Sequence, residues 1–213
     1  MSDGRGRDSG WGEVVSGQWS VVSEEMPILD PAILSQIDEL ESLAKTRTDA
    51  WQIPRVEGEL LHQIALSAGA KTIIEIGTSY GFSGLFWGAA MKRVGGRVHT
   101  FDIDPRKFEM SRATFAAAGL DKTITSHLGD AANLLPYLPG PLDIVFIDAW
   151  KEQCIAYFDQ LWPKLRPGGS IITDNAITHR KELAEYVARV RAQPGAISAE
   201  VAVGNGIEWT IKT

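Results

Sequence analysis

Acidic and amide side chains follow two apolar runs in the second half of the chain. Asp148 ends the segment DIVFID, and Asp174 and Asn175 end SIITDN. Three oxygen donors without a Cys or His pair at ligand spacing suit a hard cation such as Mg²⁺, Mn²⁺ or Ca²⁺ better than zinc. Acidic residues at strand ends are also ordinary helix caps, so the spacing alone leaves both a metal site and a set of caps open.

A segment with two glycines follows an earlier apolar run, TIIEI. It reads EIGTSYGFS from Glu75 to Ser83, and Gly77 and Gly81 permit a tight turn and a close approach of backbone to ligand. The spacing lacks the G-x-G-x-x-G pattern that seats a pyrophosphate on a helix N-terminus, which argues against NAD. Glu75 adds negative charge where the cationic methionyl group of S-adenosylmethionine could sit.

Two more acidic residues end the next two apolar runs. Asp102, followed by Ile103, stands at the distance after Gly77 where this architecture places a carboxylate against ribose hydroxyls. Asp130 and Ala131, after the third run, have the position to meet an adenine, although Asp130 can equally cap the next helix. In this order, the features favour S-adenosylmethionine as the cofactor.

These residues need a scaffold in which strand ends converge. From Lys71 onward, apolar runs alternate with helical patterns, and such alternation is typical of a parallel sheet covered on both faces. The expected strands are TIIEI, RVHTFDI, TITSHL, LDIVFIDA, SIITDN and two closing strands near Ile197 and Ile207. The sequence therefore predicts an α/β, doubly wound, Rossmann-like and mostly parallel sheet of seven strands, with ligands at the carboxyl ends of the strands.

Local signals predict where the helices begin and end. Apolar residues at three- and four-residue steps predict a satellite helix over residues 31–45 and a second helix over about 56–68. Asp104-Pro105 reads as an N-cap and first helical position, with Gly119 at the end of that helix. We expect the segment 167–169, Pro-Gly-Gly, to break a helix before the fifth strand.

Length and composition bound the domain organisation. The 213 residues, 44% of them hydrophobic, suffice for one domain with a substantial core. Residues 1–27 are rich in small and charged side chains, so we expect a poorly ordered extension there and a single methyltransferase domain over 28–213. Trp11 and Trp19 in that extension argue that it packs on its own body or on a partner subunit.

Charge and hydropathy exclude several classes of partner. A net charge of −6 opposes binding to nucleic acid. We expect no membrane partner and a cytoplasmic location, because no window approaches the ~20 apolar residues of a membrane span and the first residues are polar. The single cysteine, Cys154, is expected to be a buried bystander.

The ordered motifs resemble the cation-dependent O-methyltransferase family that includes catechol and caffeoyl-CoA O-methyltransferases. The similarity runs from about Arg55 to the C-terminus and rests on EIGTSYGFS, TFDID, GDA, FIDAWKEQ, LRPGG, TDN and the closing GIE. The resemblance implies methyl transfer from S-adenosylmethionine to a hydroxyl oxygen of a small molecule, with a catechol-like phenol chelated to Mg²⁺ or a similar ion as the acceptor. It also implies a homodimer.

The resemblance also implies a role for each matching residue. The cofactor contacts are expected at Glu75, Gly77, Ser83, Asp102, Ile103, Asp130, Ala131 and Asp148. Asp148, Asp174 and Asn175 would hold the cation, which makes Asp148 catalytic as well, and Lys151 would be the base that receives the substrate proton. Glu208 matches the carboxylate that catechol-type members use on the second hydroxyl.

The acceptor pocket is less well defined by the residues. Trp51 and Trp150 could line it, although large aromatics more often lie in a core, and His179 is a candidate pocket residue. After TDN the chain reads AITH and lacks the proline gatekeeper of animal catechol enzymes. Two alternatives stay open: a metal-independent methyltransferase acting on a sugar, antibiotic or carboxylate oxygen, and a catalytically silent module that binds the adenosyl ligand.

Overall fold

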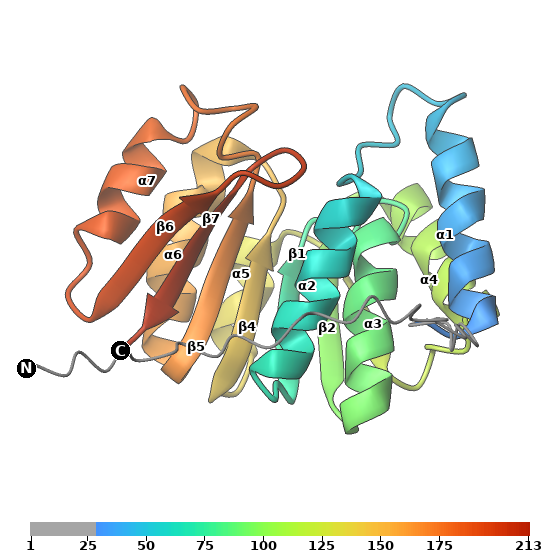
Figure 1. Ribbon diagram of the computed structural model, residues 1–213, viewed down its shortest axis with the longest axis horizontal. Coiled ribbons are helices and arrows are strands. Elements are labelled where there is room, and N and C mark those ends of the chain that lie inside the picture. The colour runs from blue at the N-terminus through green and yellow to red at the C-terminus, as the bar shows by residue number, and fades with distance from the viewer. Residues whose placement is uncertain (1–28) are drawn as a thin grey trace, which may run out of the picture.

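The computed structural model describes residues 29–213. A single seven-stranded sheet runs through them in the order β3-β2-β1-β4-β5-β7-β6 (Figure 1). All neighbours are parallel except β7, which is antiparallel to both β5 and β6. The strands are β1 Thr72–Ile76, β2 Arg97–Asp102, β3 Ile124–Leu128, β4 Leu142–Ile147, β5 Leu165–Asp174, β6 Ala196–Val201 and β7 Ile207–Lys212. The predicted α/β, mostly parallel, doubly wound sheet is confirmed.

The extension at 1–27, with Trp11 and Trp19, lies outside the described residues, so its order stays a prediction.

Helices cover both faces of the sheet. They are α1 Pro31–Ala44, α2 Arg55–Ser67, α3 Phe82–Val94, α4 Pro105–Ala117, α5 Ala131–Leu134, α6 Cys154–Leu161 and α7 Ala184–Arg191, with short 3₁₀ turns η1 Leu135–Tyr137, η2 Lys151–Gln153 and η3 Trp162–Lys164. One apolar layer packs the helices α1, α2, α3 and α4 against one face of the sheet. A second apolar layer packs α5, α6 and α7 against the other face. In the described part of the chain, no helix has the length and apolarity to cross a membrane.

Local capping explains the boundaries of two helices. Asp30 accepts a hydrogen bond from the Ala32 amide at 3.0 Å at the start of α1. Asp104 accepts one from the Arg106 amide at 2.8 Å at the start of α4. Each aspartate satisfies an amide that has no partner inside its helix, which stabilises the first turn. The predicted cap at Asp104 is therefore present.

The prediction that the segment 167–169 breaks a helix is wrong. Its residues lie inside β5, which begins at Leu165, whereas α6 already ends at Leu161. Leu142 of β4 pairs with Leu165 but Ile144 pairs with Ser170, so the residues between them bulge out of the ladder. Proline and glycine suit a bulge because the extra residues need no partner in the neighbouring strand.

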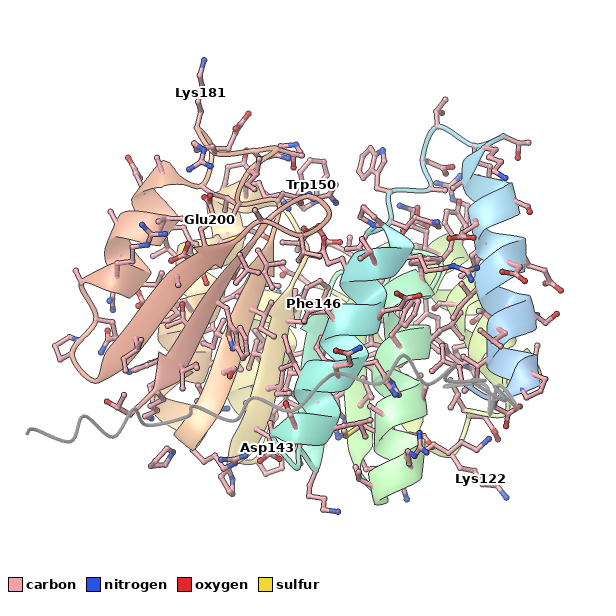
Figure 2. The ribbon with its side chains drawn as sticks, viewed as in Figure 1. Lys122, Asp143, Phe146, Trp150, Lys181 and Glu200 are labelled. Atoms are coloured by element: carbon pink, nitrogen blue, oxygen red, sulfur yellow. The ribbon has the colours of Figure 1, made fainter. Side chains whose placement is uncertain are left out.

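The direction of β4 shows which edge of the sheet carries the chemistry. Asp143 lies at one end of the strand, Phe146 in the interior and Trp150 beyond the opposite end (Figure 2). Phe146 packs edge-on against Trp87 of α3, with ring centroids 5.7 Å apart. The carboxyl ends of the parallel strands therefore meet at the edge marked by Trp150.

Candidate active site

The loops after β1 and β4 meet at this edge. The amide of Asp148 donates to the Ile76 carbonyl at 2.9 Å. Gly77 follows Ile76 with φ +102°, and a Cβ there would stand 1.9 Å from the Asp148 carbonyl oxygen. Only glycine permits both the backbone angle and this approach, so Gly77 fixes the width of the cleft.

Glu75 is a buried acid beneath the glycine loop. Its Oε1 accepts from the Ser83 hydroxyl at 2.7 Å and its Oε2 from the Thr100 hydroxyl at 2.6 Å. Burial raises the pKa of Glu75 to about 7, and the two hydrogen bonds oppose this rise. Burial disfavours the charged form of this carboxyl, and a cationic group nearby would stabilise that form.

Asp102 ends β2 and organises the same loop. Its Oδ2 accepts from the Ser79 amide at 2.7 Å and its Oδ1 from the Asp104 amide at 2.8 Å. Each oxygen of a carboxylate has a second lone pair, so acceptor capacity remains for a ligand hydroxyl. Ile103 is exposed directly beside it.

Asp130 serves as the N-cap of α5. Its Oδ1 accepts from the Ala132 amide at 2.9 Å, and Ala131 is buried. The cap, which the sequence left open as an alternative, is present. A contact from this turn to an adenine ring remains a prediction.

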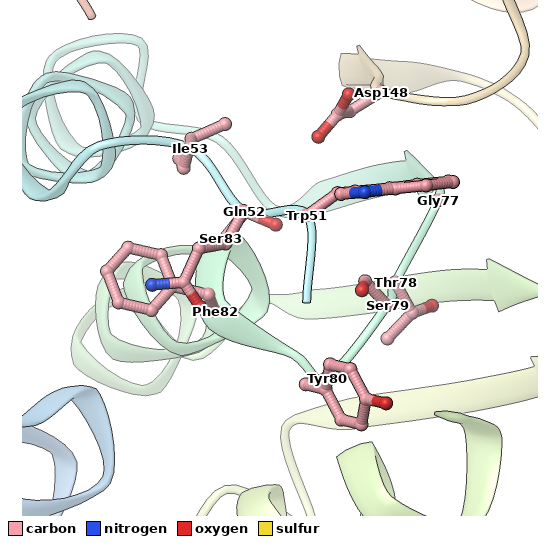
Figure 3. A pocket seen from close by; sticks show the side chains of 10 residues that line it. All are labelled: Trp51, Gln52, Ile53, Gly77, Thr78, Ser79, Tyr80, Phe82, Ser83 and Asp148. Atoms are coloured by element: carbon pink, nitrogen blue, oxygen red, sulfur yellow. The ribbon is translucent and has the colours of Figure 1, made fainter. Parts of the chain in front are cut away.

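A pocket lies between the loop after β1 and the segment that precedes α2. It is lined by Trp51, Gln52, Ile53, Gly77, Thr78, Ser79, Tyr80, Phe82, Ser83 and Asp148. Figure 3 shows the Asp148 carboxylate on one side of the Trp51 indole and the Thr78 and Ser79 side chains on the other. The structure thus brings together the predicted residues Trp51, Gly77, Ser83 and Asp148.

Several pocket residues were missed by sequence reasoning. Tyr80 donates its hydroxyl to Asp49 at 3.0 Å. The ammonium of Lys107 on α4 lies 5.1 Å from the Trp51 ring centroid and 5.5 Å from that of Tyr80. These contacts join segments far apart in the chain, so no spacing rule could have found them. They tie the segment of Trp51 over the glycine loop.

Lys151 faces Asp148. Its Nζ lies 3.5 Å from the Asp148 Oδ1, and its side chain is only 13% exposed. Burial raises the pKa of Asp148 to about 7; the charge of Asp174 adds to this rise, and Lys151 opposes it. An amine and two carboxyl groups therefore share a largely water-free corner of the cleft.

Asp174 lies at the end of β5 and is almost fully buried. Its Oδ1 accepts from the Asn175 amide, and its Oδ2 accepts from the Asn205 side chain at 3.2 Å. Burial raises the pKa of Asp174. Asn175 adopts φ +71°, a left-handed conformation that asparagine tolerates better than most residues. This turn directs the chain away from the sheet immediately after the two predicted ligands.

Glu57 was not predicted, yet it belongs to this acidic group. It is fully buried at the start of α2, and burial together with the charge of Asp174 raises its pKa to about 9. A signal was present in the sequence, because Glu57 falls on the same helix face as the apolar Leu61, Ile64 and Ala65. A carboxyl on an apolar face is costly unless it has a partner, which marks it for attention.

The donor chemistry of the predicted ligands fits a hard cation. Among residues 29–213, no three Cys, His, Asp or Glu side chains are grouped closely enough to hold a metal ion. The predicted set has only two carboxylates, Asp148 and Asp174, and one amide, Asn175. The buried Glu57 Oε1 has no hydrogen-bond partner among the described residues. Clustered buried carboxyl groups, one of which has an oxygen without a partner, are features that a bound cation would stabilise.

Glu208 does not reach the cleft, contrary to its predicted role. It pairs with Thr173 across β5 and β7, so both side chains point to the same face of the sheet. The Thr173 hydroxyl meets Tyr186 of α7 at 2.6 Å. Glu208 accepts from Arg191 at 2.7 and 2.8 Å and from the Ser198 hydroxyl at 2.6 Å. Strand alternation places it on the α7 face, opposite to its neighbour Ile207.

The remaining acceptor candidates lie at the rim. Trp51 and Trp150 are 65% and 64% exposed, so the alternative of core aromatics does not hold. Their rings meet edge to face with centroids 6.4 Å apart. His179 is exposed in the turn after Asn175, where its Nδ1 lies 3.2 Å from the Thr178 hydroxyl. The aromatic pair forms a wall beside Asp148, whereas His179 points to solvent.

Comparisons with known proteins agree with this geometry. Residues 74–176 match a family model described as a methyltransferase domain. The chain is 32% identical over 168 residues to a catechol O-methyltransferase of Niastella koreensis, covering 77% of this chain and 74% of that protein. It is 36% identical over 148 residues to a catechol O-methyltransferase of Mycobacterium tuberculosis, covering 67% of each.

The fold is also found among solved structures. An O-methyltransferase from Bacillus cereus, in complex with SAH, superposes with a TM-score of 0.75 over 88% of this chain and 94% of that one. Its sequence identity is 23%, so this similarity concerns the fold alone.

Proposed function

We propose that this chain, which belongs to the cation-dependent, catechol O-methyltransferase-like family, transfers a methyl group from S-adenosylmethionine to a hydroxyl oxygen of a small catechol-like molecule. The observation that carries the proposal is the corner formed by Lys151, Asp148 and Asp174 beside an exposed aromatic pair. That the chain is an O-methyltransferase follows from its family. The acceptor, the cation and the residue roles are our proposals.

The cofactor would bind along the loop after β1, at the carboxyl ends of the strands. The buried acid Glu75 would attract the cationic methionyl group, and Ser83 would stay bonded to the same carboxyl. Asp102 would accept from the ribose hydroxyls next to Ile103, and the turn of Asp130 and Ala131 would meet the adenine. Gly77 would let the loop approach the ligand closely.

Asp148, Asp174 and Asn175 would hold the divalent cation. Bound S-adenosylmethionine supplies the methyl group, and a bound Mg²⁺ would act as a Lewis acid that makes an acceptor hydroxyl more acidic. Lys151 in its neutral amine form would take the proton that leaves this hydroxyl, and the oxygen would gain the methyl group as the methyl–sulfur bond breaks and S-adenosylhomocysteine leaves. The Nζ of Lys151 lies 3.5 Å from the Asp148 Oδ1, so the base would be held in place before the acceptor arrives.

The aromatic rim favours a planar acceptor. Trp51 and Trp150 present large exposed rings beside the carboxylates, and such rings stack on flat aromatic ligands. A net charge of −6 is unfavourable for nucleic acid as an acceptor. We propose the catalytic unit as one domain over residues 28–213.

The test is a methyl-transfer assay with labelled S-adenosylmethionine and a panel of catechols, hydroxycinnamoyl esters and sugars. We expect transfer to a catechol that stops with EDTA and returns with Mg²⁺ or Mn²⁺. Full activity after EDTA treatment would support the metal-independent alternative. Cofactor binding with no transfer to any acceptor would support the silent binding module.

A further inference from the structure

Glu57 stands in a setting built from three segments of the chain. It lies in the first turn of α2, where the helix dipole favours negative charge. The next residue, Gly58, lets α2 press against α3, because a Cβ there would stand 2.4 Å from the Phe86 ring. The position of the carboxyl is therefore set by close helix packing.

The loop between β6 and β7 closes over the same carboxyl. The Asn205 amide donates to the Glu57 Oε2 at 3.1 Å. Gly204 has φ +55°, and a Cβ there would stand 2.3 Å from that oxygen. Glycine is needed here for both space and conformation, so the loop is fitted around Glu57.

Asn205 connects Glu57 to Asp174. Its backbone amide holds the Glu57 carboxyl, while its side-chain amide donates to the Asp174 Oδ2 at 3.2 Å. The Asn205 carbonyl accepts from the amides of Ile177 and Thr178 at 3.2 Å each. One residue thus ties the start of α2 to the turn that carries Asp174 and Asn175.

The second oxygen of Glu57 has no such partner. Its Oε1 is buried and accepts no hydrogen bond within the described part of the chain. Leaving a buried carboxyl oxygen unpaired is costly unless a ligand supplies the donor. Mg²⁺ and Mn²⁺ sites usually retain water molecules, and such water is a strong donor.

We propose that Glu57 is a positioning residue of the cation site: it holds Asp174 through Asn205 and accepts a hydrogen bond from water that accompanies the ion. The inference rests on the proposed function, because it requires that a divalent cation binds at Asp148 and Asp174. Residues that orient metal ligands from behind typically change metal affinity about 10- to 100-fold when they are replaced.

The experiment measures Mn²⁺ binding to the full chain by electron paramagnetic resonance, without acceptor or turnover. Glu57→Gln keeps the size of the side chain and one acceptor for Asn205, but it replaces the free oxygen with a donor. We expect Mn²⁺ affinity about 10- to 100-fold below that of the unaltered protein, together with a changed Mn²⁺ line shape. Glu208→Gln is the matched control, because it also removes a fully buried carboxyl but on the other face of the sheet.

The outcomes distinguish the role of Glu57 from the binding of a divalent cation by the chain. If the unaltered chain binds Mn²⁺ and Glu57→Gln binds it equally well, the role of Glu57 is overturned while the cation proposal stands. If the unaltered chain binds no Mn²⁺, both are overturned. Should Glu57→Gln not fold, Asn205→Ala takes its place, since it breaks the link to Asp174 and leaves both helices intact. Unchanged affinity in that variant would equally overturn the inference.

Discussion

The Nζ atom of Lys151 lies 3.5 Å from the Oδ1 atom of Asp148, at the point where β4 opens into η2. The two side chains share a corner in which Asp148 is 22% exposed and Lys151 13% exposed. This contact places the proposed proton acceptor and a predicted metal ligand together at the carboxyl end of a central strand.

The first prediction concerns Lys151 as the base. Lys151→Ala should lower the single-turnover rate of methyl transfer about 10²- to 10⁴-fold, while cofactor affinity stays close to that of the unaltered protein. Rapid quench on the best acceptor measures the rate, and calorimetry measures the affinity. Lys181→Ala, which removes an exposed lysine from the turn before α7, is the control (Figure 2). Unchanged rates in Lys151→Ala would show that this lysine is only a surface charge.

The second prediction separates Asp102 from its neighbour Asp104. Asp102→Ala should weaken S-adenosylmethionine binding by about 1.5–3 kcal/mol, or roughly ten- to a hundredfold, because a charge-assisted contact to ribose is lost. Asp104→Ala removes the cap of α4 and the ion pair with Arg106, so it should lower stability and leave affinity unchanged. Calorimetric titration checks both. Equal affinities for the two variants would remove Asp102 from the cofactor site.

The third prediction compares two glycines that both have positive φ. Gly77→Ala would place a methyl group 1.9 Å from the Asp148 carbonyl oxygen, so β1 and β4 must move apart at the cleft. We expect a loss of more than about 3 kcal/mol of stability together with the loss of cofactor binding. Gly69→Ala, at φ +58° with no atom within 4 Å of the new Cβ, should cost only the backbone strain of about 1 kcal/mol. Urea unfolding measures both, and similar losses would contradict the role of close contact at Gly77.

The fourth prediction is a pH dependence of the metal-free protein. The pKa of Glu57 is raised to about 9 in the fold, so its contribution to stability is fully present below the ordinary glutamate pKa and is lost as pH rises through about 9. The free energy of unfolding in EDTA should therefore fall between about pH 7 and pH 8.5. Histidine side chains ordinarily titrate below this window, and the cysteine thiol has its ordinary pKa at the upper limit. Urea titrations at both pH values measure it.

Glu57→Gln is the control for the predicted fall in the free energy of unfolding with pH. Its side chain does not titrate, so the decline between the two pH values should be much smaller than in the unaltered chain. Asp148 and Glu75, whose pKa values are both raised to about 7, titrate in both proteins, so the difference between the two declines belongs to Glu57. Stability that rises with pH in the unaltered protein would contradict the prediction.

The sequence by itself was sufficient to predict the sheet and the edge of the sheet at which Gly77, Asp148 and Asp174 lie. Alternating apolar runs and capped helices are local signals, and they identified the doubly wound fold. Parallel strands present their carboxyl ends at one edge, so the order of Gly77, Asp148 and Asp174 already implied that they converge. Chain order needs no knowledge of side-chain direction, which is why these assignments could be made.

Only the tertiary structure decided what faces the cleft. Glu208 lies one residue beyond Ile207, and because side chains alternate along a strand, that single step turns it toward Arg191 on the other face. Glu57 lies far from Asp174 in the chain, and the two meet only where α2 packs beneath the loop of Asn205. Register and long-range packing depend on every element at once, so no local pattern of residues could have specified them.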